Sequence, residues 1–293
     1  MPNIAVLGGT GYLASIVNNQ NNVKKNKYIF FSRKKKTKNF INFSNISSLN
    51  KLKKYDFIVH LLGPSKNLVQ NRKKLIVQKN KVTSKICDLC IKYNIRLIYV
   101  SSLQIYGDYG KKDILKNHKV KITSLYAKSH FESEEIIKKK FKKKSNMFTI
   151  LRLGNVFGFR KYKNIEELNN NLINNFCKIA VFKNSINIKN ASVQRTFIPS
   201  EIFIKILNMT INHKLFFNNV KSIGYKVYSL KEISLIIKKR IKKKFNKEIP
   251  IKYKIYNPLK KMKIYTSPPY NFKFLKKKFI NEIDYIINNI KKN

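Results

Sequence analysis

The 293-residue sequence contains no tryptophan, only three cysteines and only 14 acidic residues. Three cysteines cannot form an even disulfide framework, which argues against a disulfide-stabilised secreted domain and fits a reducing cytosol. No uninterrupted apolar run is long enough to cross a bilayer, and the first residues lack the basic and then apolar layout of a signal peptide. We therefore expect a cytoplasmic protein with no membrane partner.

The shortage of acidic residues leaves the chain strongly basic. It has 63 Lys and Arg residues against 14 Asp and Glu residues, a formal net charge of +49. Such a balance is typical of proteins that bind nucleic acid or anionic surfaces. Here the lysines occur along the whole chain, and Asn and Ile are abundant too, which indicates a bias toward A/T-rich codons. Nucleic-acid binding is therefore the less favoured interpretation, although a positive field would attract an anion such as a nucleoside diphosphate.

Short continuous apolar runs alternate with helical patterns in the first half of the chain. The runs cover residues 3–7, 28–31, 57–62, 96–100 and 148–151, and the clearest helical patterns cover 79–93 and 125–140. Continuous apolar runs bounded by turns are typical of parallel strands that are buried on both faces. The pattern predicts an α/β fold with a Rossmann-like, doubly wound parallel sheet.

The pattern changes after about residue 158, where segments become more polar and irregular. No linker rich in Gly, Ser or Pro separates this second part from the first. We predict a dinucleotide-binding domain over residues 1–158 and a smaller, mainly substrate-binding region over residues 159–293. Some segments of that smaller C-terminal region are expected to return to the main domain.

A glycine-rich turn follows the first predicted strand directly. Residues 8–14 read Gly-Gly-Thr-Gly-Tyr-Leu-Ala and open a helical segment. Gly8 permits the tight turn, Gly11 lets the backbone approach a pyrophosphate, and the small Ala14 permits close packing of helix on strand. Phosphates at this place would meet the positive end of the helix and its free N–H groups. The strand–turn–helix context predicts dinucleotide binding.

The end of the second predicted strand bears on the choice between NAD and NADP. Enzymes that prefer NAD usually place a carboxylate there, on the ribose 2′-hydroxyl, whereas this chain has Ser32 followed by Arg33. A hydroxyl beside a guanidinium suits a 2′-phosphate, so NADP is slightly favoured over NAD. In so lysine-rich a sequence the basic residue can also be accidental, and both cofactors stay open.

Further motifs give the chain its resemblance to a known family. They are Asp-Phe-Ile-Val-His-Leu at 56–61, Asn-Lys-Val-Thr-Ser at 80–84, Ser-Ser-Leu-Gln-Ile-Tyr-Gly at 101–107, Tyr-Ala-Lys-Ser-His at 126–130, Arg-Leu-Gly-Asn-Val-Phe-Gly at 152–158, Arg-Thr-Phe-Ile-Pro-Ser-Glu at 195–201 and Tyr-Ser-Leu-Lys-Glu at 228–232. In this order and spacing the chain resembles the extended short-chain dehydrogenases, the NAD-dependent epimerase/dehydratase family.

The resemblance implies a nucleoside-diphosphate sugar as substrate and a role for each matching residue. Ser102 would hydrogen-bond the reacting sugar oxygen, and Tyr126 would exchange a proton with it during hydride transfer. Asn155 and Arg195 would hold the nucleoside diphosphate, which a guanidinium binds bidentately. The residues expected at the cofactor are Gly8, Thr10, Gly11, Tyr12, Leu13, Ser32, Arg33, Leu61, Tyr126 and His130. No metal is implied, and a homodimer is compatible with the family.

Position 130 departs from the family, which has a lysine four residues after the tyrosine. A phenol of pKa about 10 is a poor base at neutral pH unless its phenolate is stabilised. A protonated His130 could provide that charge, and activity would then fall as pH rises through the histidine pKa. Alternatively, His130 only fills the place at the ribose, in a slowed enzyme or a non-catalytic dinucleotide-binding protein derived from one.

The residues after Ser102 narrow the reaction. Sugar dehydratases of the family place an acid pair there, whereas this chain has Leu103 and Gln104, neither of which can act as a general acid or base. The lack of a dehydratase acid pair leaves 4-epimerisation or reduction of a keto-sugar. The missing NAD-type carboxylate leans toward an NADPH-dependent reductase, and the motif at 101–107 leans toward an epimerase.

Two other groups invite a functional interpretation that we do not favour. Cys87 and Cys90 form a C-x-x-C pair, but their spacing on a predicted helix puts both on the face that packs on the sheet. His60 ends a buried strand and is interpreted as a satisfied core residue.

Overall fold

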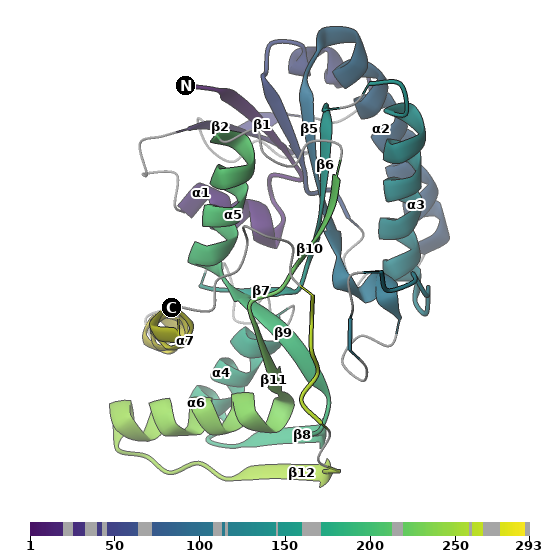
Figure 1. Cartoon of the computed structure of the whole chain (residues 1–293). Coiled ribbons are helices and arrows are strands. Elements are labelled where there is room, and N and C mark those ends of the chain that lie inside the picture. Colours follow the sequence, from purple (N-terminus) through teal and green to yellow (C-terminus); the bar gives the residue numbers. More distant parts are fainter. Residues whose placement is uncertain are drawn as a thin grey trace. The chain divides into compact units, whose positions relative to one another are not determined.

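The computed structural model in Figure 1 describes residues 1–19, 26–32, 40–42, 46–63, 72–107, 113–114, 117–144, 146–159, 171–212, 219–257, 260–265 and 276–290. The chain divides into two compact units that are interleaved along the sequence. The first unit comprises Met1–Gly107, Val120–Leu153 and Ile204–Ser222, and the second comprises Asp108–Lys119, Gly154–Phe203 and Ile223–Asn293. The division of the sequence at residue 158 stays a prediction.

A seven-stranded sheet with the order β10-β6-β5-β4-β1-β2-β3 forms the centre of the first unit. Its strands are β1 (Asn3–Leu7), β2 (Lys27–Ser32), β3 (Phe40–Asn42), β4 (Phe57–His60), β5 (Arg96–Ser102), β6 (Phe148–Leu153) and β10 (Asn219–Ile223). Each pair of neighbours from β3 to β6 is parallel. The chain leaves β1 toward β2 on one side and later returns to β4 on the other, which is the strand order of a doubly wound sheet. The predicted Rossmann-like fold is confirmed.

Helices cover both faces of this sheet, as its buried strands require. They are α1 (Tyr12–Asn19), α2 (Arg72–Tyr93), α3 (Leu125–Lys140) and α5 (Ser200–Asn212), with short 3₁₀ turns η1 (Ile46–Leu52) and η2 (Leu103–Tyr106). Figure 1 shows α2 and α3 side by side on one face, with α1 and α5 on the other. Every residue of β4 is buried, and its Ile58 packs in one core cluster with residues of α2 and α3. The helix that carries the Tyr-Ala-Lys-Ser-His motif is thus fixed to the sheet.

The described residues of the second unit form two small sheets and three helices. In one sheet β9 (Gln194–Pro199) lies between β11 (Lys226–Ser229) and β7 (Asn155–Phe157), and in the other β8 (Ile186–Asn190) pairs with β12 (Ile251–Ile255). The helices are α4 (Leu172–Phe182), α6 (Leu230–Phe245) and α7 (Lys276–Ile290). Apolar faces of all three meet in one core, which includes Ile173, Ile237 and Phe279. A capping box of Ser229 and Glu232 begins α6.

None of the helices in the described part of the chain is both long enough and apolar enough to span a membrane.

One carboxylate of the second unit is placed where burial opposes its charge. Glu282 of α7 accepts hydrogen bonds from the Ser200 hydroxyl over 2.9 Å and from the Phe159 N–H over 3.3 Å. Burial raises the pKa of Glu282 to about 7, although these two hydrogen bonds oppose the rise. The folded chain therefore holds a proton that the unfolded chain releases between the ordinary carboxyl pKa and pH 7, so stability declines as pH rises through that window.

We expect Glu282→Gln to raise the free energy of unfolding by roughly 2 kcal/mol above pH 7 and to have little effect near pH 4. The amide keeps one acceptor for Phe159 and can donate to Ser200. Urea unfolding at a series of pH values measures the difference. Glu248→Gln, at an exposed carboxylate that pairs with Lys238 and Lys242, is the control and should bring no gain. Equal stability of wild type and Glu282→Gln at pH 8 would contradict the assignment.

Candidate functional site

The turn after β1 is closed by backbone hydrogen bonds and has little room for side chains. The Gly11 N–H donates to the Gly8 carbonyl over 2.8 Å, and the Gly9 N–H donates to the Phe31 carbonyl of β2 over 2.9 Å. Gly8 has a φ of 85°, and a Cβ there would lie 3.1 Å from the backbone of Leu61. The turn thus presents backbone rather than side chains in front of α1, which is what close approach of a pyrophosphate requires.

The other residues expected at the cofactor lie around the carboxyl ends of β1, β2 and β4. Thr10 is exposed in the turn, and the half-buried Tyr12 and Leu13 begin α1. Ser32 is buried at the end of β2. Arg33 lies outside the described residues, so the NADP preference stays a prediction.

Leu61 is tied to the end of β1. It is half-buried, and its N–H donates to the Leu7 carbonyl over 3.0 Å. This bond continues the pairing of β4 with β1 one residue beyond the strand, so Leu61 sits directly beside the glycine turn.

Ser102 and Tyr126 meet at the end of β5. Ser102 is the last residue of β5 and caps η2, where its Oγ accepts from the Gln104 N–H over 3.2 Å. Ser124 caps α3 in the same way by accepting from the Ala127 N–H over 3.1 Å, which places Tyr126 in the first turn of the helix. Burial raises the pKa of Tyr126, and a hydrogen bond with Ser102 opposes that rise. The predicted serine and tyrosine are therefore in contact.

His130 packs against Tyr126 one turn further along α3. The two rings meet edge to face, with centroids 4.7 Å apart. A hydrogen bond of 3.0 Å joins Nδ1 of His130 to the hydroxyl of Tyr99, a buried residue of β5. The structure thus brings Ser102, Tyr126 and His130 together and adds Tyr99 behind them.

A buried lysine stands behind Tyr99, and sequence reasoning missed it. Lys79 of α2 is only 7% exposed, and its Nζ donates to Tyr99 Oη over 2.9 Å and to the carbonyl and hydroxyl of Ser129 over 3.0 Å each. Burial lowers the pKa of Lys79 to about 7, while Glu134 and Glu132 oppose that change. The sequence did contain a signal that Lys79 is buried. Lys79 lies at helical spacing from Thr83, Ile86 and Cys90, with steps of four, three and four residues, and these three residues are buried.

His60 is a core residue, as the sequence suggested. Its Nδ1 accepts from the Leu62 N–H over 3.2 Å, and its Nε2 lies 2.9 Å from Thr83 Oγ1, which itself donates to the Lys79 carbonyl. This pattern places the proton of the neutral ring on Nε2. Burial, with a smaller contribution from the charge of Lys79, lowers the pKa of His60 to about 3. His60 is therefore neutral and has both ring nitrogens satisfied.

A buried ion pair holds α3 against the sheet. Arg152 of β6 donates from Nε and Nη2 to the carboxylate of Glu134 on α3, with distances of 2.6 to 3.2 Å. The Ser101 hydroxyl donates to the same carboxylate over 2.6 Å, and Arg152 Nη1 donates to Tyr106 Oη over 2.9 Å. Because Ser101 adjoins Ser102 and Glu134 follows Tyr126 by two turns, the network connects the two elements that carry the candidate site.

Asn155 and Arg195 lie together in the second unit. Asn155 begins β7 and donates from Nδ2 to the Thr196 carbonyl over 3.2 Å, and Arg195 of the adjacent β9 donates from Nη1 to the Gln194 carbonyl over 2.8 Å. A Cβ on Gly154 would collide with the Thr196 side chain. The two residues expected at the diphosphate are thus neighbours on one small sheet.

Cys87, Cys90 and Cys177 are free and buried. Burial is the main cause that raises the pKa of Cys87 to about 12, so its thiol stays protonated. Within the described ranges no cluster of His, Cys, Asp and Glu could hold a metal ion.

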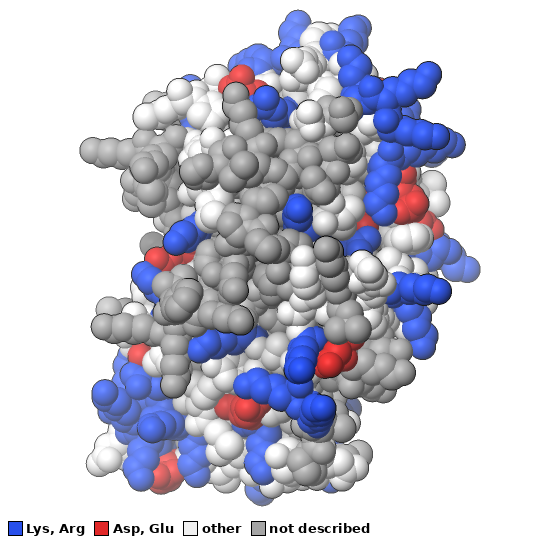
Figure 2. Space-filling view, in the orientation of Figure 1, with Lys and Arg blue, Asp and Glu red and all other residues white. Residues whose placement is uncertain are grey.

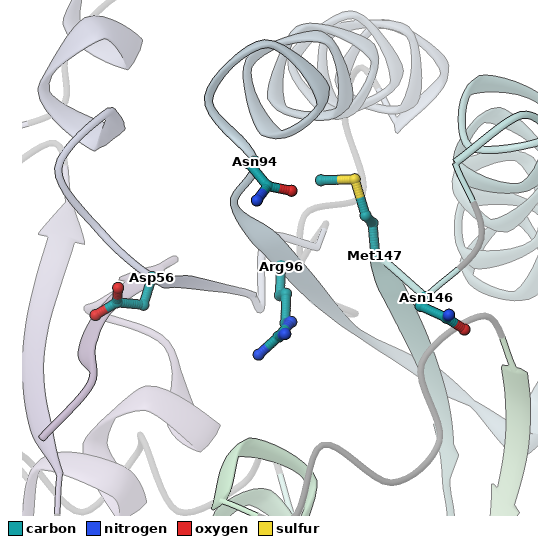
Figure 3. A pocket seen from close by; sticks show the side chains of 5 residues that line it. All are labelled: Asp56, Asn94, Arg96, Asn146 and Met147. Carbon is teal, nitrogen blue, oxygen red and sulfur yellow. The ribbon is translucent and has the colours of Figure 1, made fainter.

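The pocket in Figure 3 lies at the opposite end of the strands from the glycine turn. It has a volume of about 390 Å³ and is lined by Asp56, Asn94, Arg96, Asn146 and Met147. Asp56 precedes β4, Arg96 begins β5 and Met147 precedes β6, so these side chains mark the amino ends of the strands. Ligands of doubly wound sheets bind at the carboxyl ends, and the pocket is therefore not part of the candidate site.

Figure 2 shows Lys and Arg side chains on many separate parts of the visible face, with few acidic side chains among them. This distribution agrees with the spread of lysines along the sequence.

Comparison with known proteins identifies both a family signature and a common fold. A family model described as the NAD dependent epimerase/dehydratase family matches residues 4–214. A search of curated proteins found no match.

The solved structures that resemble this chain include several epimerases. UDP-N-acetylglucosamine 4-epimerase from Bacillus cereus has a TM-score of 0.76 at 19% identity, with 99% of this chain and 100% of that chain covered. The enzyme of that name from Methanobrevibacter ruminantium M1, in complex with UDP-N-acetylmuramic acid, has a TM-score of 0.77 at 21% identity, with 100% and 99% covered. UDP-glucose 4-epimerase from Bifidobacterium longum, in complex with NAD+ and UDP, has a TM-score of 0.75 at 17% identity, with 99% and 98% covered. At these identities the likeness shows the fold.

Proposed function

Because the chain belongs to the NAD-dependent epimerase/dehydratase family, we propose that it transfers hydride at a carbon of a nucleoside-diphosphate sugar, as an epimerase or a keto-sugar reductase. The observation that carries the proposal is the contact of Ser102 with Tyr126 at the carboxyl end of β5. This pair shares one compact unit with the glycine turn. A proton-exchanging phenol and a dinucleotide cradle on one sheet are the two parts that such a reaction needs.

The residues present fit a nicotinamide dinucleotide. Neither Gly8 nor Gly11 places a side chain in the turn, and the turn stands directly before the N-terminus of α1, where a pyrophosphate would meet the positive end of the helix. Several solved relatives contain NAD. For this chain we keep NADP slightly ahead of NAD, since Ser32 and Arg33 supply a hydroxyl and a guanidinium where NAD enzymes usually have a carboxylate.

Tyr126 is the proposed acid and base of the reaction, and Ser102 orients the sugar oxygen. A nicotinamide bound in this site supplies hydride exchange with the sugar carbon. The phenolate of Tyr126 takes the proton of the sugar hydroxyl when the carbon is oxidised, and the phenol formed in this way returns the proton when the carbonyl is reduced. Ser102 is hydrogen-bonded to Tyr126, and its single O–H can be donated either to the phenolate or to the sugar oxygen.

Asn155 and Arg195 are proposed to hold the nucleoside diphosphate. The guanidinium supplies charge and a planar pair of donors, and the Asn155 amide supplies neutral donor and acceptor groups. Some solved relatives are described with UDP or a UDP-sugar bound, which makes UDP-sugars the first substrates to test. The proposed setting is the cytoplasm, and a homodimer is the proposed assembly.

For this chain we propose epimerisation or reduction rather than dehydration. Leu103 is buried in η2, and Gln104 beside it carries no carboxyl group. The elimination of water therefore lacks an acid pair. The second candidate function is a non-catalytic dinucleotide-binding protein, which the replacement of the family lysine by His130 favours.

Titration with NADH and NADPH, followed by nicotinamide fluorescence, is the test of the proposal. The protein contains no tryptophan, so its own emission interferes little. We expect saturable binding that a UDP-sugar alters. Gly11→Val should weaken it by about 10-fold or more, because the new side chain stands where the pyrophosphate approaches.

The net charge of the chain calls for a control, since a basic surface attracts any anion. Binding that vanishes at 0.15 M salt, or that nucleic acid displaces as well as a UDP-sugar does, would mean that the diffuse charge is responsible. Binding of a dinucleotide without turnover of any epimer or keto-sugar would establish the non-catalytic alternative.

A further inference from the structure

A charged side chain is held inside the first unit directly behind the candidate site. The Nζ of Lys79 has three hydrogen-bond acceptors at 2.9 to 3.0 Å, namely Tyr99 Oη and the carbonyl and hydroxyl of Ser129. An ammonium group has three N–H donors and no acceptor, so this geometry suits the charged form. Tyr99 Oη in turn lies 3.0 Å from Nδ1 of His130. One hydroxyl therefore connects the lysine to the ring that touches Tyr126.

Other titratable groups surround Lys79 on every element that packs against it. Those that face it are His60 from β4, Tyr99 from β5, and His130, Glu132 and Glu134 from α3. His60 is neutral for the reasons given above, and Glu134 is already paired with Arg152. Lys79 is thus the lysine or arginine cation that donates directly to the Tyr99 hydroxyl.

Tyr126 needs such a charge if it is to act as a base. Burial raises its pKa, which moves the phenol further from neutrality, and the hydrogen bond with Ser102 only partly opposes that change. A positive charge near the phenolate favours the ionised form. His130 touches Tyr126, but an imidazole supplies a positive charge only when it is protonated.

We infer that Lys79 is a positioning residue of the proposed reaction, which through the Tyr99 hydroxyl fixes the His130 ring and supplies the positive charge that stabilises the Tyr126 phenolate. The inference rests on the proposed function. The positive charge then comes from Lys79, and His130 itself need not be protonated. Lys79 belongs to α2, which contributes none of the other residues assigned to the candidate site.

A charge supplied by Lys79 and a charge supplied by His130 predict different dependences of kcat on pH. Because burial lowers the pKa of Lys79 to about 7, its charge is present below that pH and is lost as pH rises through it. We expect the wild-type kcat to decline on that basic side, and Lys79→Met to lack this decline. If His130 had to be protonated instead, Lys79→Met would keep the decline.

The variants test the inference by kinetics. We expect Lys79→Met to lower kcat by about 10- to 100-fold with unchanged dinucleotide affinity. Lys81→Met removes the same charge from an exposed place on α2 and should behave as wild type. Tyr99→Phe keeps the ring and removes only the linking hydroxyl, so it provides the test if Lys79→Met does not fold. The double variant Lys79→Met/Tyr99→Phe should lose no more than the larger single loss.

A variant that moves the lysine from position 79 to position 130 distinguishes an electrostatic role of Lys79 from a role in packing alone. Lys79→Met/His130→Lys places the cation directly beside Tyr126 and should recover much of the lost kcat. A role of Lys79 in packing alone predicts no such recovery. Unchanged kcat in both Lys79→Met and Tyr99→Phe, or a loss of dinucleotide binding in place of turnover, would overturn the inference.

A measurement without substrate keeps this inference apart from the proposed function. The chain has only four histidines, so ¹⁵N-histidine spectra can be assigned by single substitutions. Lys79→Met and Tyr99→Phe should each shift the ring nitrogens of His130 and leave those of His118, in the other unit, in place. Unshifted His130 nitrogens would overturn the connection whether or not the protein turns over a sugar. Shifted nitrogens in a protein that binds no dinucleotide would instead reject the proposed function.

Discussion

Tyr126→Phe should lower kcat for sugar turnover by about 10²- to 10⁴-fold, the usual contribution of a positioned proton-transfer group. The substitution removes one oxygen and leaves the ring that packs against His130. Ser102 loses the phenolic partner, while the glycine turn and Leu61 are untouched. Dinucleotide affinity should therefore stay close to that of wild type, and the loss should appear in kcat more than in KM.

Tyr93→Phe is the matched control for this experiment. Tyr93 ends α2 with 40% of its surface exposed, and loss of its hydroxyl should leave kcat unchanged. Steady-state rates and NADH titrations of both variants make the comparison. A Tyr126→Phe enzyme with wild-type kcat would show that another group moves the proton, and a parallel loss of NADH binding would indicate a damaged fold.

Much of the first unit could be predicted from the sequence because its signals are local. The apolar runs at 28–31 and 96–100 lie within parallel strands, the run at 57–62 begins β4, which ends at His60, and the glycine turn stands between β1 and α1. Short continuous apolar runs that are bounded by turns are typical of buried parallel strands. The contact of Ser102 with Tyr126 followed from a family motif, since two residues 24 positions apart have no local signal that pairs them.

The sequence did not predict β10 in the main sheet. Residues 219–223 lie next to β6, although residues 154–203, which belong to the second unit, come between the two strands in the sequence. Strand pairing over such a separation depends on tertiary packing, and the short segment Asn-Val-Lys-Ser-Ile has only two apolar residues, with no continuous apolar run.

The sequence also did not predict which charged residues are buried. Lys79 lies in a helix with many exposed lysines, and only its alignment with Thr83 and Ile86 distinguishes it. Glu134 has acidic neighbours on α3, and Arg152 ends an apolar run. Composition cannot reveal which carboxylate and which cation will be taken out of water together, because the pair exists only after α3 has packed on β5 and β6.

The Glu134–Arg152 pair should therefore dominate the stability of this region. Glu134→Gln removes one charge and leaves the guanidinium of Arg152, whose side chain is 10% exposed, without a counter-charge. Removal of one partner of a buried pair typically costs about 3–5 kcal/mol. We expect a loss of that size in the free energy of unfolding, measured by urea denaturation.

Glu135→Gln supplies the control one residue along the same helix. Glu135 pairs with Lys138 at the surface over 2.8 Å, with both side chains more than a third exposed, and exposed pairs contribute less than about 1 kcal/mol. Equal losses in Glu134→Gln and Glu135→Gln would contradict the assignment. Glu134→Leu/Arg152→Met should regain much of the stability, because apolar residues can replace a buried pair. That double variant should still lose turnover, since the Ser101–Glu134 bond that fixes α3 beside Ser102 would be gone.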